Sequence, residues 1–135
     1  MIKTAEEFVR LRNSDIPEEY SRASHGQATV DVWKEVIATY PEMAFWVAHN
    51  KTVPYELLEL LSENGESRVR SMVASKNMLL EPLLLKLATD EDDSVRMAVA
   101  RHKKATLAVL EKFANDPWEE IVALVSKRIK NGSFK

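Results

Sequence analysis

Apolar residues recur along this chain with a period of 26 residues. The recurrence is clearest in short apolar triplets that end in a small residue: Trp46-Val47-Ala48, Met72-Val73-Ala74, Ala98-Val99-Ala100 and Leu124-Val125-Ser126. One further apolar residue lies three positions before each triplet, at Met43, Val69, Val95 and Ile121. Units in register at a fixed period predict a repeat protein, in which each unit buries its apolar face against its neighbours.

Each repeat is expected to contain two short helices. Its first half carries leucines at helical spacing, as in Leu57, Leu58 and Leu61, rather than the alternation of a strand. Residues that favour helix starts stand before the first helices at Thr29, Thr52, Asn77 and Thr106, and before the second helices at Ser67, Asp93 and Asp116. Pro117 is expected to open the last helix, and Gly65 to end a first helix in the left-handed conformation.

The ends of the chain depart from the repeat. Residues 1–27 lack its pattern and are expected to form an N-terminal helical cap, which starts at a capping box formed by Thr4 and Glu7. The helix-pair repeats are assigned to residues 28–52, 53–77, 78–104 and 105–130, with a tail at 131–135. The prediction is therefore a single all-α domain over residues 1–135.

The second half of the repeat contains a sequence motif that is similar to motifs of known repeat proteins. It reads Asp-x-Ser-Val-Arg-x-x-Val-Ala at residues 92–100 and recurs at residues 66–74 with Glu in the first place and Arg in the third. This motif resembles HEAT-like repeats and, more closely, the leucine-rich repeat variant family. The resemblance implies a right-handed α-α superhelix, a HEAT-like solenoid of about four helix pairs, and leaves the function open. Ala44 and Val122 stand where the motif has Arg.

Composition narrows the class of protein. The chain has 135 residues, 45% of them hydrophobic, and no Cys, which excludes disulfides, thiolate metal sites and the cysteine-ligated iron–sulfur cluster of one member of the variant family. The first residues contain no apolar run typical of a secretory signal, and no apolar stretch is long enough to span a membrane, so a cytoplasmic protein is expected.

Charge is divided along the chain. Residues 1–66 carry 6 basic and 12 acidic residues, whereas residues 101–135 carry 8 basic and 4 acidic residues. Chance and the preferences of helix ends explain such a division, and so does a dipolar surface that steers a charged partner. The sequence leaves both interpretations open.

Metal and catalytic sites find little support in the sequence. The acidic run at residues 90–93 would need Gly and Glu at later places of a calcium loop, where Val95 and Arg101 stand. Gly-rich phosphate loops and serine-nucleophile motifs are missing. The histidines are expected at exposed helix ends, too far apart to share a zinc ion: His25, His49 and His102. We therefore expect no metal, no cofactor and no catalytic residue, and we do not expect an enzyme.

Arg70 and Arg96 occupy one column of the repeat, directly after a core residue. In repeats that this chain resembles, such an arginine bonds an acidic residue in the turn between helices, for which Glu66, Asp92 and Asp116 are the candidates. The alternative is an exposed row of arginines that binds an anion or an acidic partner on the concave surface. A buried ladder and an exposed row have the same sequence, so both remain open.

Aromatic residues supply the other candidates for a contact surface. Trp33 and Trp46 fall in apolar columns and are expected in the core. Phe45 and His49, one helical turn apart, fall in columns that need not be buried, as does Trp118 in a turn; packing against the terminal caps is an equal alternative. The candidate interaction surface comprises Phe45, His49, Arg70, Arg96, Arg101 and Trp118.

The repeat, the divided charge and the missing catalytic motifs favour a non-enzymatic protein–protein interaction or scaffold module, with a protein partner still to be identified. The alternative is nucleic-acid binding related to DNA repair, as in DNA glycosylases built of HEAT-like repeats. The basic residues available for phosphate contacts are Arg68, Arg70, Arg96, Arg101, Lys103 and Lys104. A sequence pI near 6.0 argues against this alternative. A resemblance to HEAT-like bilin lyases ranks last, because the chain is short and lacks Cys.

Overall fold

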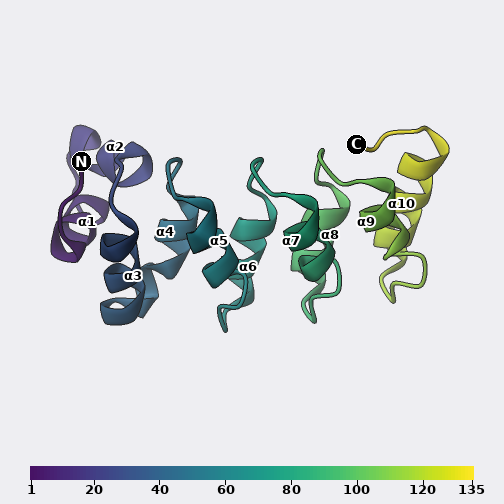
Figure 1. The fold of residues 1–135 in the computed structure, drawn as a ribbon, viewed down its shortest axis with the longest axis horizontal. Coiled ribbons are helices and arrows are strands. Elements are labelled where there is room, and N and C mark those ends of the chain that lie inside the picture. Colours follow the sequence, from purple (N-terminus) through teal and green to yellow (C-terminus); the bar gives the residue numbers. More distant parts are fainter. The chain divides into compact units, whose positions relative to one another are not determined.

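A computed structural model describes all residues, 1–135, and contains only helices. Ten α-helices and one 3₁₀ turn follow one another along the chain, with no strand (Figure 1). The all-α prediction is therefore confirmed. The helices divide into two compact units, Met1–Leu61 and Ser62–Lys135, and each unit is described by itself.

The first unit contains α1 (Ala5–Arg12), α2 (Pro17–His25), α3 (Val30–Thr39), the 3₁₀ turn η1 (Pro41–Met43), α4 (Ala44–His49) and α5 (Tyr55–Leu61). Helix α1 packs against α2 and α3, and α3 packs against α4 and α5. The rings of Phe8 and Trp33 meet edge to face at the centre of this unit, with 5.1 Å between their centroids, and both side chains are fully buried. The expected core position of Trp33 is confirmed.

Helix α1 begins at the predicted Thr4. The Thr4 hydroxyl accepts a hydrogen bond from the Glu7 backbone N–H, as in a capping box. The Glu7 carboxylate reaches back to the N–H of Lys3, one residue before the cap, at 2.7 Å. This bond holds the pKa of Glu7 below its ordinary value, because an accepted hydrogen bond favours the ionised carboxylate.

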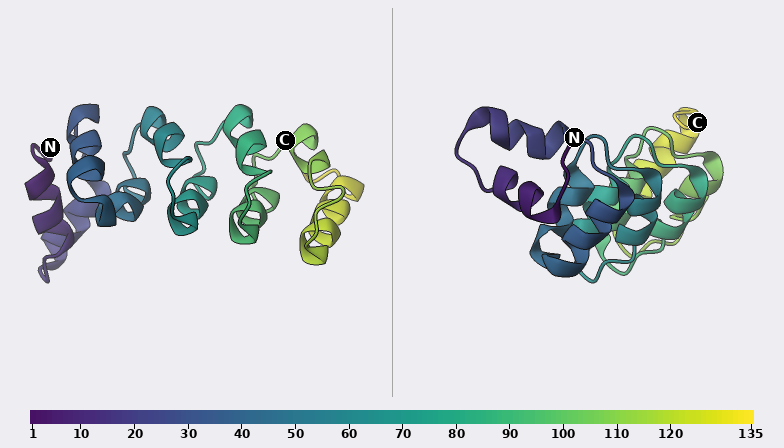
Figure 2. Two further views of the ribbon diagram at one scale, coloured as in Figure 1. Left: turned by 90° about the horizontal axis from the view of Figure 1, so that it is seen from below. Right: turned by 60° about the vertical axis from the view of Figure 1, so that its left-hand side comes forward.

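The second unit contains α6 (Ser67–Ala74), α7 (Glu81–Leu87), α8 (Asp93–Ala100), α9 (Leu107–Glu111) and α10 (Glu119–Lys130). Its helices form two rows, because α8 packs between α6 and α10 while α7 packs against α9. The turns of this unit alternate between two edges, with α6–α7 and α8–α9 on one edge and α7–α8 and α9–α10 on the other (Figures 1 and 2).

Apolar positions of the repeat form the core of the second unit. Two valines four residues apart bury one face of α6 and of α8, and the same positions of α10 hold Ile121 and Val125. The first helices contribute the buried leucines of α7 and the buried residues Val109 and Leu110 of α9, and Phe113 is buried just after α9. Since burial of one such side chain contributes about 1.5–3 kcal/mol, neither helix of a pair could be stable without its neighbours.

Two of the four expected caps of the first helices are present. The hydroxyl groups of Thr29 and Thr106 accept hydrogen bonds at the starts of α3 and α9. The prediction was wrong for Thr52 and Asn77, because α5 and α7 begin at Tyr55 and Glu81, several residues later. The Thr52 hydroxyl instead donates to the carbonyl of Gly26 at 3.1 Å.

Turn residues were predicted less accurately than helices. Gly65 does not adopt the left-handed conformation expected of it; among the glycines only Gly132, which follows α10, has a positive φ, of 65°. Helix α10 begins at Glu119 rather than at Pro117. The backbone N–H of Trp118 bonds the side chain of Asp116, and this bond keeps the residues before α10 in a turn.

No helix combines the length and the apolar character that crossing a bilayer requires.

The core of the first unit predicts a specific loss of stability. Phe8→Ala should lower the free energy of unfolding by about 3–5 kcal/mol, because it removes a fully buried ring and leaves a cavity beside Trp33. Leu60→Ala is the control, since that side chain is 49% exposed on α5. Urea denaturation followed by circular dichroism measures both variants. Equal losses for the two would contradict this packing.

Candidate interaction surface

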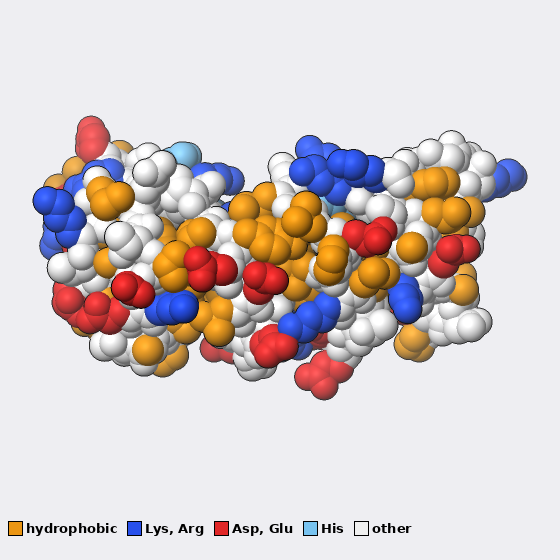
Figure 3. Space-filling view, viewed as in Figure 1, with side chains coloured by type: hydrophobic (Ala, Val, Ile, Leu, Met, Phe, Trp, Pro, Cys, Tyr) orange, Lys and Arg blue, Asp and Glu red, His pale blue; other side chains and the backbone are white.

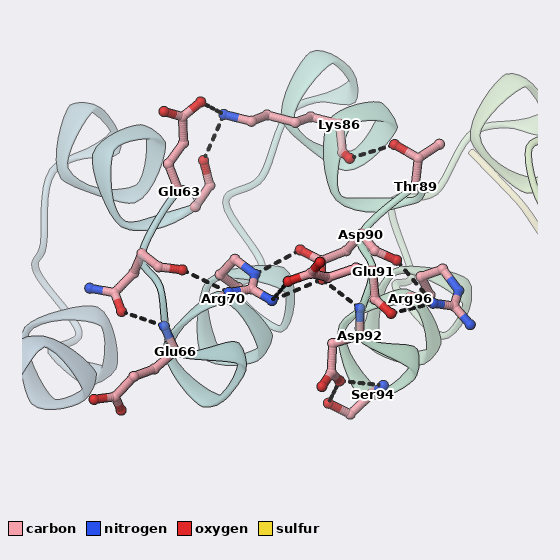
Figure 4. A network of polar contacts seen from close by, with 12 residues as sticks. Glu63, Glu66, Arg70, Lys86, Thr89, Asp90, Glu91, Asp92, Ser94 and Arg96 are labelled. Atoms are coloured by element: carbon pink, nitrogen blue, oxygen red, sulfur yellow. Dashed lines mark hydrogen bonds and ion pairs between the residues drawn. The ribbon is translucent and has the colours of Figure 1, made fainter.

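Arg70 is buried in an ion pair rather than exposed. From α6, its Nε donates to Oδ2 of Asp90 at 2.8 Å and its Nη2 donates to Oδ1 of the same carboxylate at 3.1 Å. Its Nη1 donates to the backbone carbonyl of Asn64 at 2.7 Å (Figure 4). The side chains of Arg70 and Asp90 are only 10% and 9% exposed. The pair is therefore closed to solvent and geometrically bidentate.

Arg96 forms the same arrangement 26 residues later in the chain. From α8, its Nε donates to Oδ2 of Asp116 at 2.8 Å, and its Nη1 donates to the backbone carbonyl of Asp90 at 2.9 Å. The side chains of Arg96 and Asp116 are 12% and 5% exposed. Of the two interpretations left open by the sequence, the geometry matches the buried ladder, and neither guanidinium is available to an external anion.

The ladder depends on a second repeated position, in the turns. Asn64, Asp90 and Asp116 are spaced by 26 residues. Each side chain accepts a hydrogen bond from the backbone N–H two residues later, at 2.9 Å in all three turns. This Asx turn aims each aspartate at the arginine.

Of the acidic partners predicted for the two arginines, Asp116 is confirmed as the partner of Arg96. Glu66 and Asp92 are wrong, because the partner of Arg70 is Asp90. The column at 64, 90 and 116 was the signal that would have found the aspartate. Asp92 instead accepts hydrogen bonds from the hydroxyl and the N–H of Ser94 at the start of α8. These bonds hold the pKa of Asp92 below its ordinary value.

Hydrogen bonding and burial act in opposite directions on Arg70. Its hydrogen bonds to Asp90 raise the pKa of the guanidinium, whereas burial, the smaller effect, lowers it. Because the charge stays on a group with little solvent around it, the arginine depends on the carboxylate. Removal of the carboxylate would leave an uncompensated buried charge.

The opposite edge of the second unit is held by polar side chains that bind backbone carbonyls. His102 follows α8, and its Nε2 donates to the carbonyl of Lys76 at 2.7 Å. Arg128 lies on α10, and its Nη1 donates to the carbonyls of Ala100 and His102, at 2.7 and 3.0 Å. Lys76, His102 and Arg128 are again spaced by 26 residues. These bonds tie the α6–α7 turn, the α8–α9 turn and the end of α10 together.

His102 is buried, so its predicted exposure was wrong. Its side chain fills the space between two turns, and the residue is only 5% exposed. Besides the bond from Nε2 to Lys76, its Nδ1 accepts a hydrogen bond from the Lys104 N–H at 3.0 Å. The ring therefore carries its proton on Nε2 in the neutral form. The burial of His102 depends on a bond to a turn 26 residues earlier in the chain, which its own helix end does not reveal.

Charged residues on this edge are all basic. We call the segments 75–80, 101–106 and 127–135 the basic edge; their charged side chains belong to Lys76, Arg101, Lys103, Lys104, Lys127, Arg128, Lys130 and Lys135. The Lys135 backbone N–H bonds the Ala105 carbonyl at 2.9 Å, which places the C-terminal segment beside the α8–α9 turn. Figure 3 shows the basic side chains gathered at this turn.

A hollow of about 490 Å³ opens on the basic edge between the ends of α6 and α8. Its lining consists of Ser75, Asn77, Ala98, Arg101, His102 and Lys103. The Arg101 and Lys103 side chains are exposed, and neither forms an ion pair within the unit. In contrast to Arg70 and Arg96, these cations face solvent.

The aromatic candidates lie in the first unit. Phe45, Trp46 and His49 form a cluster on α4, in which the Phe45 and His49 rings stack with 6.3 Å between centroids. The Arg12 guanidinium lies 3.4 Å from the centroid of the Trp46 ring. All three aromatic residues are half-buried, so Trp46 is less buried than the core position expected of it.

The remaining candidates separate within the second unit. Trp118 is half-buried in the α9–α10 turn, on the edge that carries the ladder, whereas Arg101 lies on the basic edge. The structure therefore does not bring Trp118 together with Arg101. Phe45 and His49 belong to the other unit.

Comparisons of the chain with protein-family models, curated proteins and solved structures give no match.

The ladder predicts an asymmetric response to substitution. Asp116→Asn should lower the free energy of unfolding by about 3–5 kcal/mol, because it leaves the Arg96 charge buried without a carboxylate. Replacement of both partners, Arg96→Met with Asp116→Leu, should cost less than Asp116→Asn alone, since no charge is then stranded. Glu91→Gln is the control, because its side chain is 92% exposed and should contribute less than about 1 kcal/mol. Urea denaturation measures the free energy of unfolding of each variant. An Asp116→Asn variant as stable as the control would refute the ladder.

The bonds of His102 predict its tautomer. Long-range ¹H–¹⁵N correlation spectra at neutral pH should place the proton of this ring on Nε2, and the Nε2–H should exchange slowly with water. His25, an exposed residue on α2, provides the comparison within the same spectrum. A proton on Nδ1 of His102 would be incompatible with the bond from the Lys104 N–H.

Proposed function

We propose that this chain is a non-enzymatic module that binds a protein partner, built as a HEAT-like stack of helix pairs akin to the leucine-rich repeat variant. In this proposal the helix pairs form a right-handed α-α superhelix of about four repeats over a single domain. The contacts that support it are the ladder bonds of Arg70 and Arg96, which recur at the period of the sequence. Stacked helix pairs are suited to extended binding surfaces.

One observation carries the functional part of the proposal. The buried charged pairs of the second unit serve to join one turn to the next, whereas the side chains of Arg101 and Lys103 are exposed, that of Lys104 is half-buried, and none of the three forms an ion pair. The ladder charges that stabilise the fold are buried, whereas the exposed charges of the basic edge are all positive. Displayed charge of a single sign favours the encounter with an oppositely charged partner.

Nucleic-acid binding is the weaker alternative. Two of its proposed phosphate contacts, Arg70 and Arg96, are occupied by Asp90 and Asp116. The edge that carries these pairs also displays the carboxylates of Glu63, Glu66 and Glu91, which would repel a phosphate backbone.

Affinity capture from a nuclease-treated lysate of the native cells tests the proposal. The immobilised chain should retain one or a few proteins saturably, and the purified partner should bind in isothermal titration calorimetry. The Glu91→Gln variant should retain the same partner, whereas Asp116→Asn should lose it in proportion to its unfolding. Retention seen only in an untreated lysate and lost after nuclease treatment would contradict the proposed function. Turnover of a substrate by the pure chain without any partner would also contradict it.

A further inference from the structure

The basic edge combines exposed positive charge with a fixed geometry. The turn that carries Arg101, Lys103 and Lys104 is anchored on both sides: His102 binds the Lys76 carbonyl, and Arg128 binds the His102 carbonyl. Anchored turns hold exposed side chains near one position, so less conformational entropy is lost when a ligand binds. The basic edge is therefore preorganised.

Burial at this edge leaves its positive charge uncompensated. Arg128 is half-buried and bonds only carbonyls, those of Ala100, His102 and Ser133, and burial lowers the pKa of its guanidinium. Glu81, at the start of α7, accepts a hydrogen bond from the Thr106 hydroxyl. No ion pair within the unit involves Arg101, Lys103, Lys104 or Arg128. Arg101 and Lys103, which line the hollow, are thus without an ion pair, and the carboxylate bonded to the α8–α9 turn is that of Glu81.

Exposed apolar side chains belong to one of the turns that line the hollow. Asn77 lines it, and the α6–α7 turn continues with Met78 and Leu80, which are 38% and 60% exposed. Large aliphatic side chains this exposed form a contact area beside the cations. A ligand complementary to this surface would carry both carboxylates and an apolar residue.

We propose that the basic edge binds an acidic polypeptide segment that carries an aliphatic residue. Its carboxylates pair with Arg101, Lys103 and Lys104, and its aliphatic side chain contacts Met78 and Leu80. This inference rests on the proposed function and names the chemistry of the partner. Electrostatic complementarity of this kind sets the rate of association and its dependence on salt.

A polypeptide fits this edge better than a nucleic acid does. Recognition of single strands requires exposed rings on which bases stack, whereas Phe134, the one Phe, Tyr or Trp of the basic edge, is half-buried and the exposed apolar side chains of the α6–α7 turn are the aliphatic Met78 and Leu80. The formal charge of the whole chain is −2, and the other edge of the second unit is acidic in two of its turns. A long polyanion would meet those carboxylates, whereas a short acidic segment would not.

Fluorescence anisotropy with a defined probe tests the inference. The probe is a short fluorescein-labelled peptide of Glu and Asp residues around one Leu, added to the full chain at low salt. The double variant Arg101→Glu with Lys103→Glu should weaken binding at least about tenfold, because two attractive contacts become repulsive. Lys112→Glu is the control: it reverses one charge at an exposed position on the ladder edge, half the charge change of the double variant, and should alter affinity less than about twofold.

Further arms keep the outcome decisive. Arg101→Ala with Lys103→Ala should also weaken binding, and it replaces the reversal variant if that variant unfolds by circular dichroism. Equal weakening by Lys112→Glu, no binding of the peptide, or tighter binding of a short oligo-dT strand that depends on Arg101 and Lys103 would each overturn the inference. If affinity capture yields a protein partner whose binding ignores these two residues, the inference fails while the proposed function stands.

Discussion

A buried arginine paired with the aspartate of the next turn is the interaction on which the second unit depends. Its guanidinium has little solvent around it, so it requires a carboxylate and carbonyls within hydrogen-bond distance. Asp90 meets this requirement twice, since its carboxylate binds Arg70 and its backbone carbonyl binds Arg96. One turn thereby fixes the position of the helices before and after it. Apolar packing supplies most of the stability, and the ladder supplies the register.

The second unit uses charge differently on its two edges. On the ladder edge, arginines and aspartates point inward and cancel one another. On the basic edge, the His102 imidazole and the Arg128 guanidinium hold the turns by binding carbonyls, and those bonds need no carboxylate. Arg101 and Lys103 beside them therefore form no ion pair within the unit and can pair with the carboxylates of a partner. This division refines the charge asymmetry along the sequence into an asymmetry across one unit.

The sequence predicted what repeats and missed what is local to a turn. The helices and the buried positions at Val69, Val95 and Ile121 could be predicted from the 26-residue period, because burial selects the same residue types at each recurrence of the pattern. The starts of α5 and α7 could not be predicted in this way. Thr52 and Asn77 resemble helix caps in sequence, but the Thr52 hydroxyl binds the Gly26 carbonyl and Asn77 lines the hollow on the basic edge. The choice between a ladder and an exposed row depends on a contact 20 residues away, between Arg70 and Asp90, which no local pattern encodes.

Two classes of arginine exist in this unit: Arg70 and Arg96 are buried in ion pairs, and Arg101 is exposed. Nuclear magnetic resonance of the arginine Nε–H groups, recorded while the acidic peptide is added, distinguishes the two classes. We expect slow exchange with water and unchanged shifts for Arg70 and Arg96, which bond Asp90 and Asp116, and fast exchange with a peptide-dependent shift for Arg101. Fast exchange or a peptide-dependent shift at Arg70 or Arg96, with Arg101 unmoved, would contradict this division into two classes.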